Sequence, residues 1–199
     1  MSESRLFADQ VIRSREICGR AAGLQSIHRC AIVTAELKKT PFNTAPRGLA
    51  VCEEESNVMD LKKRLHNTLE ALIWQGFRHF LTSATQGIEL WAAEELIKLR
   101  EQYHDVILEI VIPYDKHSGK WQQQYQERYR VLCEQADIVT TISHSYNKGA
   151  IFARNRYLMA SCSTLLFAYT EGTATERLAQ QARWAGKQSI RLPLVRRAA

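Results

Sequence analysis

The 199-residue sequence lacks several features that would place it in a specialised class of protein. Its longest apolar run, Val106 to Ile112, is interrupted by Glu109 and falls well short of the roughly 18 residues that a membrane span needs. The N-terminus lacks the charged-then-apolar order of a secretory signal. We therefore expect a soluble, cytoplasmic protein with no membrane partner.

The sequence also lacks the motifs of several common enzyme classes. It contains no Gly-x-x-x-x-Gly-Lys-Ser/Thr, no His-Glu-x-x-His and no Gly-x-Ser-x-Gly, which disfavours a P-loop NTPase, a zinc protease and an α/β-hydrolase. Its five cysteines form no Cys-x-x-Cys pair and its six histidines are scattered. We therefore expect reduced, mostly buried cysteines and no metal site. A Cys–His nucleophile stays open, but no segment indicates one.

The composition is that of an ordinary globular protein, with 45% hydrophobic and 24% charged residues, and the length favours one domain. We place that domain at residues 28–195, with an N-terminal helical extension at 1–27 and a tail at 196–199. A net charge of +6 favours an anionic partner, which could be nucleic acid, an acidic protein or a phosphorylated small molecule. Because the basic residues are dispersed, a solvated basic surface is the favoured alternative.

Short apolar runs alternate with longer stretches of helical spacing from His28 onward. This order predicts an α/β, Rossmann-like three-layer fold, with a mostly parallel sheet and helices on both faces. The expected strands are 30–34, 77–82, 106–112, 138–142, 164–169 and 188–192. Helical apolar faces occur at 61–73, 88–99, 121–132 and 174–185, and Gly76 and Gly186 follow the first and last of them as left-handed caps. Residues 38–57 are expected to form a long loop, with 49–52 as a candidate for a short extra strand.

Ligands of open α/β sheets bind beyond the carboxyl ends of the strands, so the turns at those ends are the first candidates for a site. The turn after the second strand contains Ser83, Gly87 and Glu89, in a run of small residues that lets a phosphate or a ribose approach the backbone. An ordinary strand-to-helix turn is the equally weighted alternative. In that case Ser83 or Thr85 caps the helix and Glu89 is favourably placed in its first turn.

A second candidate turn follows the fifth strand, where Gly172 allows close approach and Thr173 offers a hydroxyl. Glu176 lies in the first turn of the next helix, where it could contact a ribose hydroxyl or act as an acid or base. A capping box with Thr173 is the favoured alternative.

A third candidate is Arg154-Asn155-Arg156, in the helix before the fifth strand. An arginine fork binds phosphate through paired donors. A solvated surface position is the alternative, and it is favoured more strongly for Arg156 than for Arg154.

Four pieces of the sequence together resemble the YpsA-like branch of the SLOG superfamily. They are Phe80-Leu-Thr-Ser-Ala-Thr-Gln-Gly-Ile-Glu-Leu-Trp-Ala-Ala-Glu94, the helix at 121–129, Arg154-Asn-Arg-Tyr157 and residues 165–173. The resemblance implies a Rossmann-like fold and a ligand that is a nucleotide, a nucleotide-derived signal or nucleic acid. It also implies which residues line the ligand pocket. Ser83, Gly87 and Glu89 would form one wall, and Arg154, Asn155, Gly172 and Thr173 would form the other.

The sequence departs from this family at two glycine positions. Residues 34–39 stand where the family carries a glycine-bearing loop, and Ala84 replaces the glycine that follows Ser83. Both changes narrow the space for a phosphate, although Lys38 and Lys39 could compensate with their charge. The lonely-guy phosphoribohydrolases of the same superfamily carry Pro-Gly-Gly-x-Gly-Thr-x-x-Glu, of which only the second half is present here, at 172–176.

We therefore expect a protein that binds or senses a nucleotide or an ADP-ribose-like molecule without demonstrable catalysis, and we identify no other cofactor. One alternative is a phosphoribohydrolase that cleaves a nucleoside monophosphate, with Glu176 as the catalytic residue. The other is a nucleic-acid-binding protein, the less favoured partner class. Whether the chain is an enzyme is left open, and self-association is compatible with the sequence.

Overall fold

The computed structural model describes residues 29–34, 55–169 and 173–192. Six strands in these ranges form one sheet in the order β4-β3-β2-β1-β5-β6, and every pair of neighbours is parallel. The strands are β1 (Arg29–Thr34), β2 (His79–Thr82), β3 (Ile107–Ile112), β4 (Ile138–Thr141), β5 (Thr164–Ala168) and β6 (Gln188–Leu192). This architecture confirms the α/β, Rossmann-like fold class.

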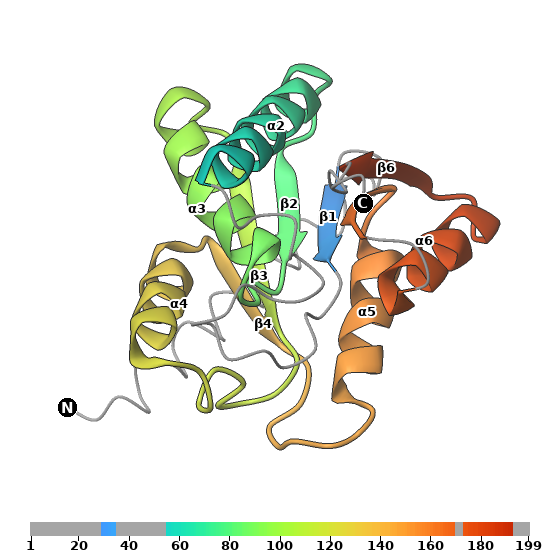
Figure 1. The fold of residues 1–199 in the computed structure, drawn as a ribbon. Helices are drawn as coiled ribbons and strands as arrows, with labels where there is room; N and C mark the ends of the chain where they lie inside the picture. Colours follow the sequence, from blue (N-terminus) through green and yellow to red (C-terminus); the bar gives the residue numbers. More distant parts are fainter. Residues whose placement is uncertain (1–28, 35–54, 170–172, 193–199) are drawn as a thin grey trace.

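Helices α2 (Glu55–Trp74), α3 (Ile88–Gln102) and α4 (Gln123–Gln135) pack on one face of the sheet, and α5 (Ala150–Ser161) and α6 (Ala174–Trp184) pack on the other (Figure 1). The strand order explains this division, because right-handed crossovers place helices on opposite faces when the direction of stepping reverses. From β1 to β4 the chain steps one way, and from β5 to β6 it steps the other way. The reversal creates a topological switch point between β1 and β5, where Thr34 pairs with Ala168.

The sheet separates two hydrophobic cores, as the period-two alternation of strand side chains requires. Ile32, Phe80 and Leu108 face the core under α2, α3 and α4, whereas Val33 and Phe167 face the core under α5 and α6. The predicted apolar face of α2 is buried: Leu61, Leu65, Leu69, Leu72 and Ile73. Since each buried large apolar side chain contributes roughly 1.5–3 kcal/mol, these cores hold the carboxyl edge of the sheet in place.

Some sequence-based boundaries need correction. Helix α2 already begins at Glu55, so the loop expected at 38–57 was extended too far, and Trp121 precedes α4 rather than lying in it. The positive φ angles of Gly76 (93°) and Gly186 (73°) confirm both glycines as left-handed helix stops. The expected N-terminal extension and the tail lie outside the described residues, so the domain boundaries stay a prediction. None of the described helices is long and apolar enough to cross a membrane.

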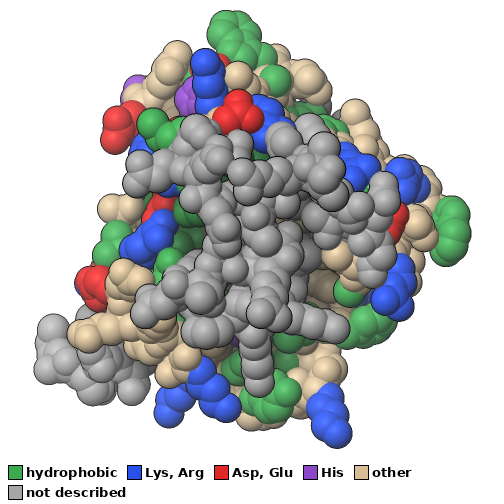
Figure 2. Space-filling view, viewed as in Figure 1, with side chains coloured by type: hydrophobic (Ala, Val, Ile, Leu, Met, Phe, Trp, Pro, Cys, Tyr) green, Lys and Arg blue, Asp and Glu red, His purple; other side chains and the backbone are tan. Residues whose placement is uncertain are grey.

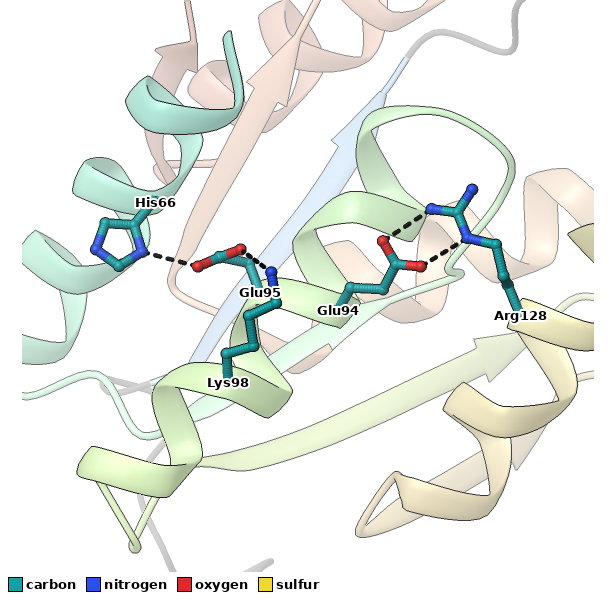
Figure 3. A network of polar contacts seen from close by, with 5 residues as sticks. All are labelled: His66, Glu94, Glu95, Lys98 and Arg128. Atoms are coloured by element: carbon teal, nitrogen blue, oxygen red, sulfur yellow. Dashed lines mark hydrogen bonds and ion pairs between the residues drawn. The ribbon is translucent and has the colours of Figure 1, made fainter. Parts of the chain in front are cut away.

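Polar contacts fix helix α3 between α2 and α4 (Figure 3). Glu94 of α3 accepts two hydrogen bonds of 2.8 Å from Arg128 of α4. Glu95 is joined to His66 of α2 at 2.8 Å and to Lys98 at 3.3 Å. Burial raises the pKa of the Glu95 carboxyl, but these hydrogen bonds outweigh burial and hold the pKa below its usual value. Helix α3, which begins at the candidate site, is therefore braced from both sides.

Glu109 of β3 is a buried carboxylate, 2% exposed, that ties three strands to α5. His79 Nε2 lies 2.8 Å from one carboxylate oxygen, and the hydroxyls of Thr140 and Tyr157 donate to the other at 2.8 Å each. Burial raises the pKa of Glu109, but the three hydrogen bonds outweigh it and lower that pKa. Burial and the Glu109 charge raise the pKa of Tyr157 to about 12. Because Glu109 is satisfied on both oxygens, we assign it a structural role.

We predict that Glu109→Gln lowers the free energy of unfolding at neutral pH by about 1–3 kcal/mol, because an amide cannot accept all three hydrogen bonds. The folded-state pKa of Glu109 is depressed, so the carboxylate stabilises the fold above its ordinary pKa of about 4.5 and loses that effect as the pH falls through the folded-state value. Chemical denaturation at a series of acid pH values checks this. The variant should lose less stability on acidification than the unchanged protein, with Glu101→Gln, at an exposed carboxylate of α3, as the control.

Candidate functional site

Three of the predicted site residues, Ser83, Glu89 and Arg154, meet beyond the carboxyl ends of β1 and β2. Glu89, in the first turn of α3, is 1% exposed and accepts hydrogen bonds from the Thr34 backbone N–H at 2.9 Å and the Thr34 hydroxyl at 3.4 Å. Its second oxygen accepts from the Thr85 N–H at 3.4 Å and lies 3.7 Å from Arg154 Nη1. One carboxylate thus joins β1, the turn after β2 and helix α5 beside the switch point.

Arg154 of α5 is 4% exposed. Its Nη1 donates to the hydroxyl of Ser83, which is fully buried, and pairs with Glu89. Its Nε, in contrast, is buried without a hydrogen-bond partner among the described residues, and so is Oδ1 of the neighbouring Asn155. An unpaired donor on a buried charge carries a large free-energy cost, so the Arg154 Nε calls for an acceptor beyond those that the described residues supply. Arg156 is exposed, as expected for a solvated position.

The turn that positions Glu89 requires unusual backbone conformations. Gly87, the residue before α3, has φ 109° and ψ −136°, a combination that side chains strongly disfavour, and Ala84 has a left-handed φ of 49°. The expectation that Ser83 or Thr85 caps α3 is wrong, because the cap residue is Gly87 and no side chain among the described residues bonds there. Glu89 reaches back to the Thr85 N–H instead.

Two residues of this region, His117 and Tyr129, were missed by the sequence analysis. Both ring nitrogens of His117 and the hydroxyl of Tyr129 are buried without a hydrogen-bond partner in the described part of the chain. Burial and the nearby charge of Arg154 lower the pKa of His117 to about 4. Burial raises the pKa of the Tyr129 hydroxyl well above its usual value, and the neighbouring Cys133 and then the charge of Glu89 act in the same direction. The charge of Arg154 thus acts on the His117 ring, and the charge of Glu89 acts on the Tyr129 hydroxyl after the larger effects of burial and Cys133.

A row of five aromatic rings leads from this cluster to the surface. The rings follow one another edge to face, with centroid separations of 5.1 Å for Tyr129–Trp121, 5.3 Å for Trp121–His117, 5.1 Å for His117–Tyr114 and 5.1 Å for Tyr114–Tyr146. Tyr129 is buried, whereas Tyr146 is 67% exposed. The inner end of the row is therefore part of the polar cluster, and its outer end faces solvent.

The second predicted turn is only partly described, because Gly172 lies outside the described residues. Thr173 precedes α6, and its hydroxyl accepts a hydrogen bond from the Glu176 N–H at 3.3 Å, as expected for helix capping. Ligand binding by Gly172 and Thr173 and a catalytic role for Glu176 stay predictions. In the ranges that the structure describes, no group of three or more His, Cys, Asp or Glu residues is placed to hold a metal ion.

A parallel sheet with helices on both faces and a polar cluster beside the switch point defines a Rossmann-like α/β protein. The family model described as the YspA SLOG family (YpsA) matches residues 48–191, and the chain belongs to this family. The resemblance identified from the sequence is thereby confirmed.

Similar curated proteins include UPF0398 proteins of two bacteria. The protein from Staphylococcus saprophyticus is 31% identical over 121 residues, or 60% of this chain, and the one from Halalkalibacterium halodurans is 34% identical over 113 residues, or 56% of this chain. The matched regions span 64% and 60% of the lengths of these two relatives.

Two solved structures of DNA processing protein A share the fold. The Streptococcus pneumoniae protein has a TM-score of 0.53 at 11% identity, covering 83% of this chain and 50% of that one. The Helicobacter pylori protein has a TM-score of 0.50 at 13% identity, covering 86% of this chain and 67% of that one. At this level of identity the two structures establish a shared architecture.

We predict that Gly87→Ala lowers the free energy of unfolding by about 1–3 kcal/mol, because a side chain is strained at its φ and ψ angles. Urea denaturation measures this effect. The matched control is Gly149→Ala, since Gly149 precedes α5 with an ordinary φ of −88° and faces only the flexible Asn147 side chain. Equal stabilities of the two variants would show that the Gly87 conformation is not required.

We also predict that His117→Phe keeps or raises stability at neutral pH, because it preserves the ring contacts and removes two unsatisfied nitrogens. The folded-state pKa of about 4 lies below the ordinary value of 6.5, so the unfolded chain binds a proton first and the native protein loses stability as the pH falls between these values. In a pH series of thermal melts, the melting temperature of the variant should fall less between pH 6.5 and pH 4 than that of the unchanged protein. A clear loss of stability at neutral pH would mean that the His117 nitrogens have partners.

Proposed function

We propose that the protein binds a nucleotide-derived small molecule at the carboxyl edge of the sheet, in contact with Arg154. The observation that carries this proposal is the buried Arg154 Nε, which lacks a partner among the described residues although Nη1 of the same side chain is paired with Ser83 and Glu89. A buried ion pair of this kind adds little stability compared with apolar packing. Ligand recognition explains the buried pair of Arg154 and Glu89, which a contribution to stability does not explain.

The inner end of this site suits an uncharged, hydrogen-bonding group such as a base or a ribose. The Glu89 carboxylate already lies at the N-terminus of α3, where a phosphate would otherwise be attracted, and it accepts the Thr85 N–H. Glu89 and Arg154 balance each other in charge, and His117 is uncharged at neutral pH because its pKa is about 4. A phosphate at this position would be repelled by Glu89. The charged end of the ligand would therefore lie farther from Glu89, toward the protein surface.

Two further observations support a ligand built from nucleotides. The sequence resembles a superfamily whose ligands are nucleotides, nucleotide-derived signals or nucleic acid. The fold is shared with a Helicobacter pylori protein whose structure was described for its single-stranded DNA binding. Phosphoribohydrolysis through Glu176 stays a prediction, because no contact among the described residues favours a catalytic role for Glu176. The cytoplasmic setting and self-association also stay predictions.

We predict that Arg154→Gln weakens ligand binding at least tenfold, since a charge-assisted hydrogen bond is worth about 1.5–3 kcal/mol. Isothermal titration against adenosine, AMP, ADP-ribose and NAD measures the affinity. Arg156→Gln is the matched control, because this arginine lies on the same helix but is exposed. A thermal melt of each variant confirms that it is folded.

Two outcomes would contradict this proposal. One is that no compound of the panel binds. The other is that a compound binds with the same affinity to the unchanged protein and to folded Arg154→Gln, which would place the ligand elsewhere.

A further inference from the structure

Two loops at the carboxyl edge of the sheet carry the same three-residue pattern. The loop between β3 and α4 contains Tyr114-Asp-Lys116, and the loop between β4 and α5 contains Tyr146-Asn-Lys148. Tyr146 is 67% exposed, and both lysines are exposed as well. We call Tyr114, Lys116, Tyr146 and Lys148 the tyrosine–lysine platform. It lies at the outer end of the aromatic row, away from the inner contacts of Arg154.

Contacts between the two loops hold this platform together. The rings of Tyr114 and Tyr146 meet edge to face at 5.1 Å. The backbone N–H of Asp115 donates to the Ser143 carbonyl at 3.2 Å, and the Asp115 carboxylate lies 3.5 Å from His144 Nδ1. Because these contacts cross from one loop to the other, the two Tyr-x-Lys units form one surface and need no ligand to assemble them.

The backbone at Lys116 has an unfavourable conformation within this surface. Its φ of 59° is left-handed, and its carbonyl accepts the Gly119 N–H at 2.9 Å in a tight turn. A Cβ added at Gly119 would lie only 3.1 Å from that carbonyl oxygen. Strained positions of this kind persist where the surrounding structure fixes them and are concentrated at functional sites. The hydrogen bond and the close approach of Gly119 therefore fix the turn that carries Lys116.

The charge of the two loops is positive. Residues 113–122 and 142–149 contain three lysines, Lys116, Lys120 and Lys148, against the single carboxylate of Asp115, which lies beside His144. Lys, Arg and hydrophobic side chains appear together along the lower edge in Figure 2, the edge at which the loops before α4 and α5 lie in Figure 1. Such a surface attracts an anionic partner that also offers flat apolar groups.

We propose that the tyrosine–lysine platform binds single-stranded nucleic acid, with a base stacking on the exposed Tyr146 ring, which Tyr114 supports edge to face, and phosphates contacting Lys116 and Lys148. A single strand alternates flat bases with phosphates, which matches tyrosines and lysines spaced two residues apart in both loops. A duplex hides the faces of its bases, and an anionic vesicle offers no flat groups to stack. This site is separate from the proposed contact of a small molecule with Arg154.

Fluorescence anisotropy with a labelled twelve-nucleotide oligothymidine and the full chain tests this proposal. Tyr146→Ala should weaken binding about tenfold through the loss of base stacking. Lys148→Gln should reduce the slope of log affinity against log salt by about 0.7, the value for one phosphate contact on a single strand. Two exposed residues on other elements serve as controls that should change neither quantity: Trp184→Ala on α6 and Lys63→Gln on α2.

Three results would each overturn this proposal. The first is that the oligonucleotide does not bind at low salt, and the second is that Tyr146→Ala leaves its affinity unchanged. The third is that duplex DNA or phosphatidylserine vesicles compete with the labelled oligonucleotide as effectively as an unlabelled single strand does. Arg154→Gln separates this proposal from the small-molecule site, because it should retain oligonucleotide binding. Loss of oligonucleotide binding in folded Arg154→Gln would mean that the strand enters the inner site, and it would also overturn the platform.

Discussion

The buried carboxylate of Glu89 is the interaction that organises the carboxyl edge of this protein. It accepts the backbone N–H groups of Thr34 and Thr85 and lies beside Arg154, so it joins a strand, a turn and a helix from three parts of the chain. A carboxylate that is 1% exposed needs these partners, because an unpaired charge in the interior is strongly destabilising. The φ of 109° at Gly87 lets α3 begin where Glu89 can reach back to Thr85.

Around this carboxylate the structure contains polar atoms that stability alone does not explain. Arg154 Nε, the Tyr129 hydroxyl and the His117 nitrogens are buried without partners in the described ranges, whereas the equally buried Glu109 is satisfied by three neighbours. The contrast separates a structural cluster within the sheet from the proposed ligand-binding cluster at its edge. The aromatic row leads from this proposed cluster, in which Glu89 and Arg154 balance each other in charge, to a positively charged surface at Tyr146.

Local sequence patterns predicted much of the fold and part of the site. Alternating apolar runs identified the strands, and the sequence favoured a solvated position more strongly for Arg156 than for Arg154; the structure has Arg156 exposed and Arg154 buried. The predicted cap of α3 was wrong. The dihedral angles of the turn, and not the presence of Ser83 or Thr85, decide which residue precedes the helix. His117 could not be found, because its burial depends on rings from Tyr114 and Trp121 and not on any periodic signal.

The role of Arg154 is tested most directly by following its side-chain Nε–Hε resonance by NMR while adenosine or ADP-ribose is added. We expect this resonance to shift with the bound fraction, because the unpaired donor gains an acceptor, while the resonance of exposed Arg156 stays in place. Binding that shifts resonances elsewhere and leaves the Arg154 Nε–Hε resonance unchanged would show that the buried cluster is not the ligand site.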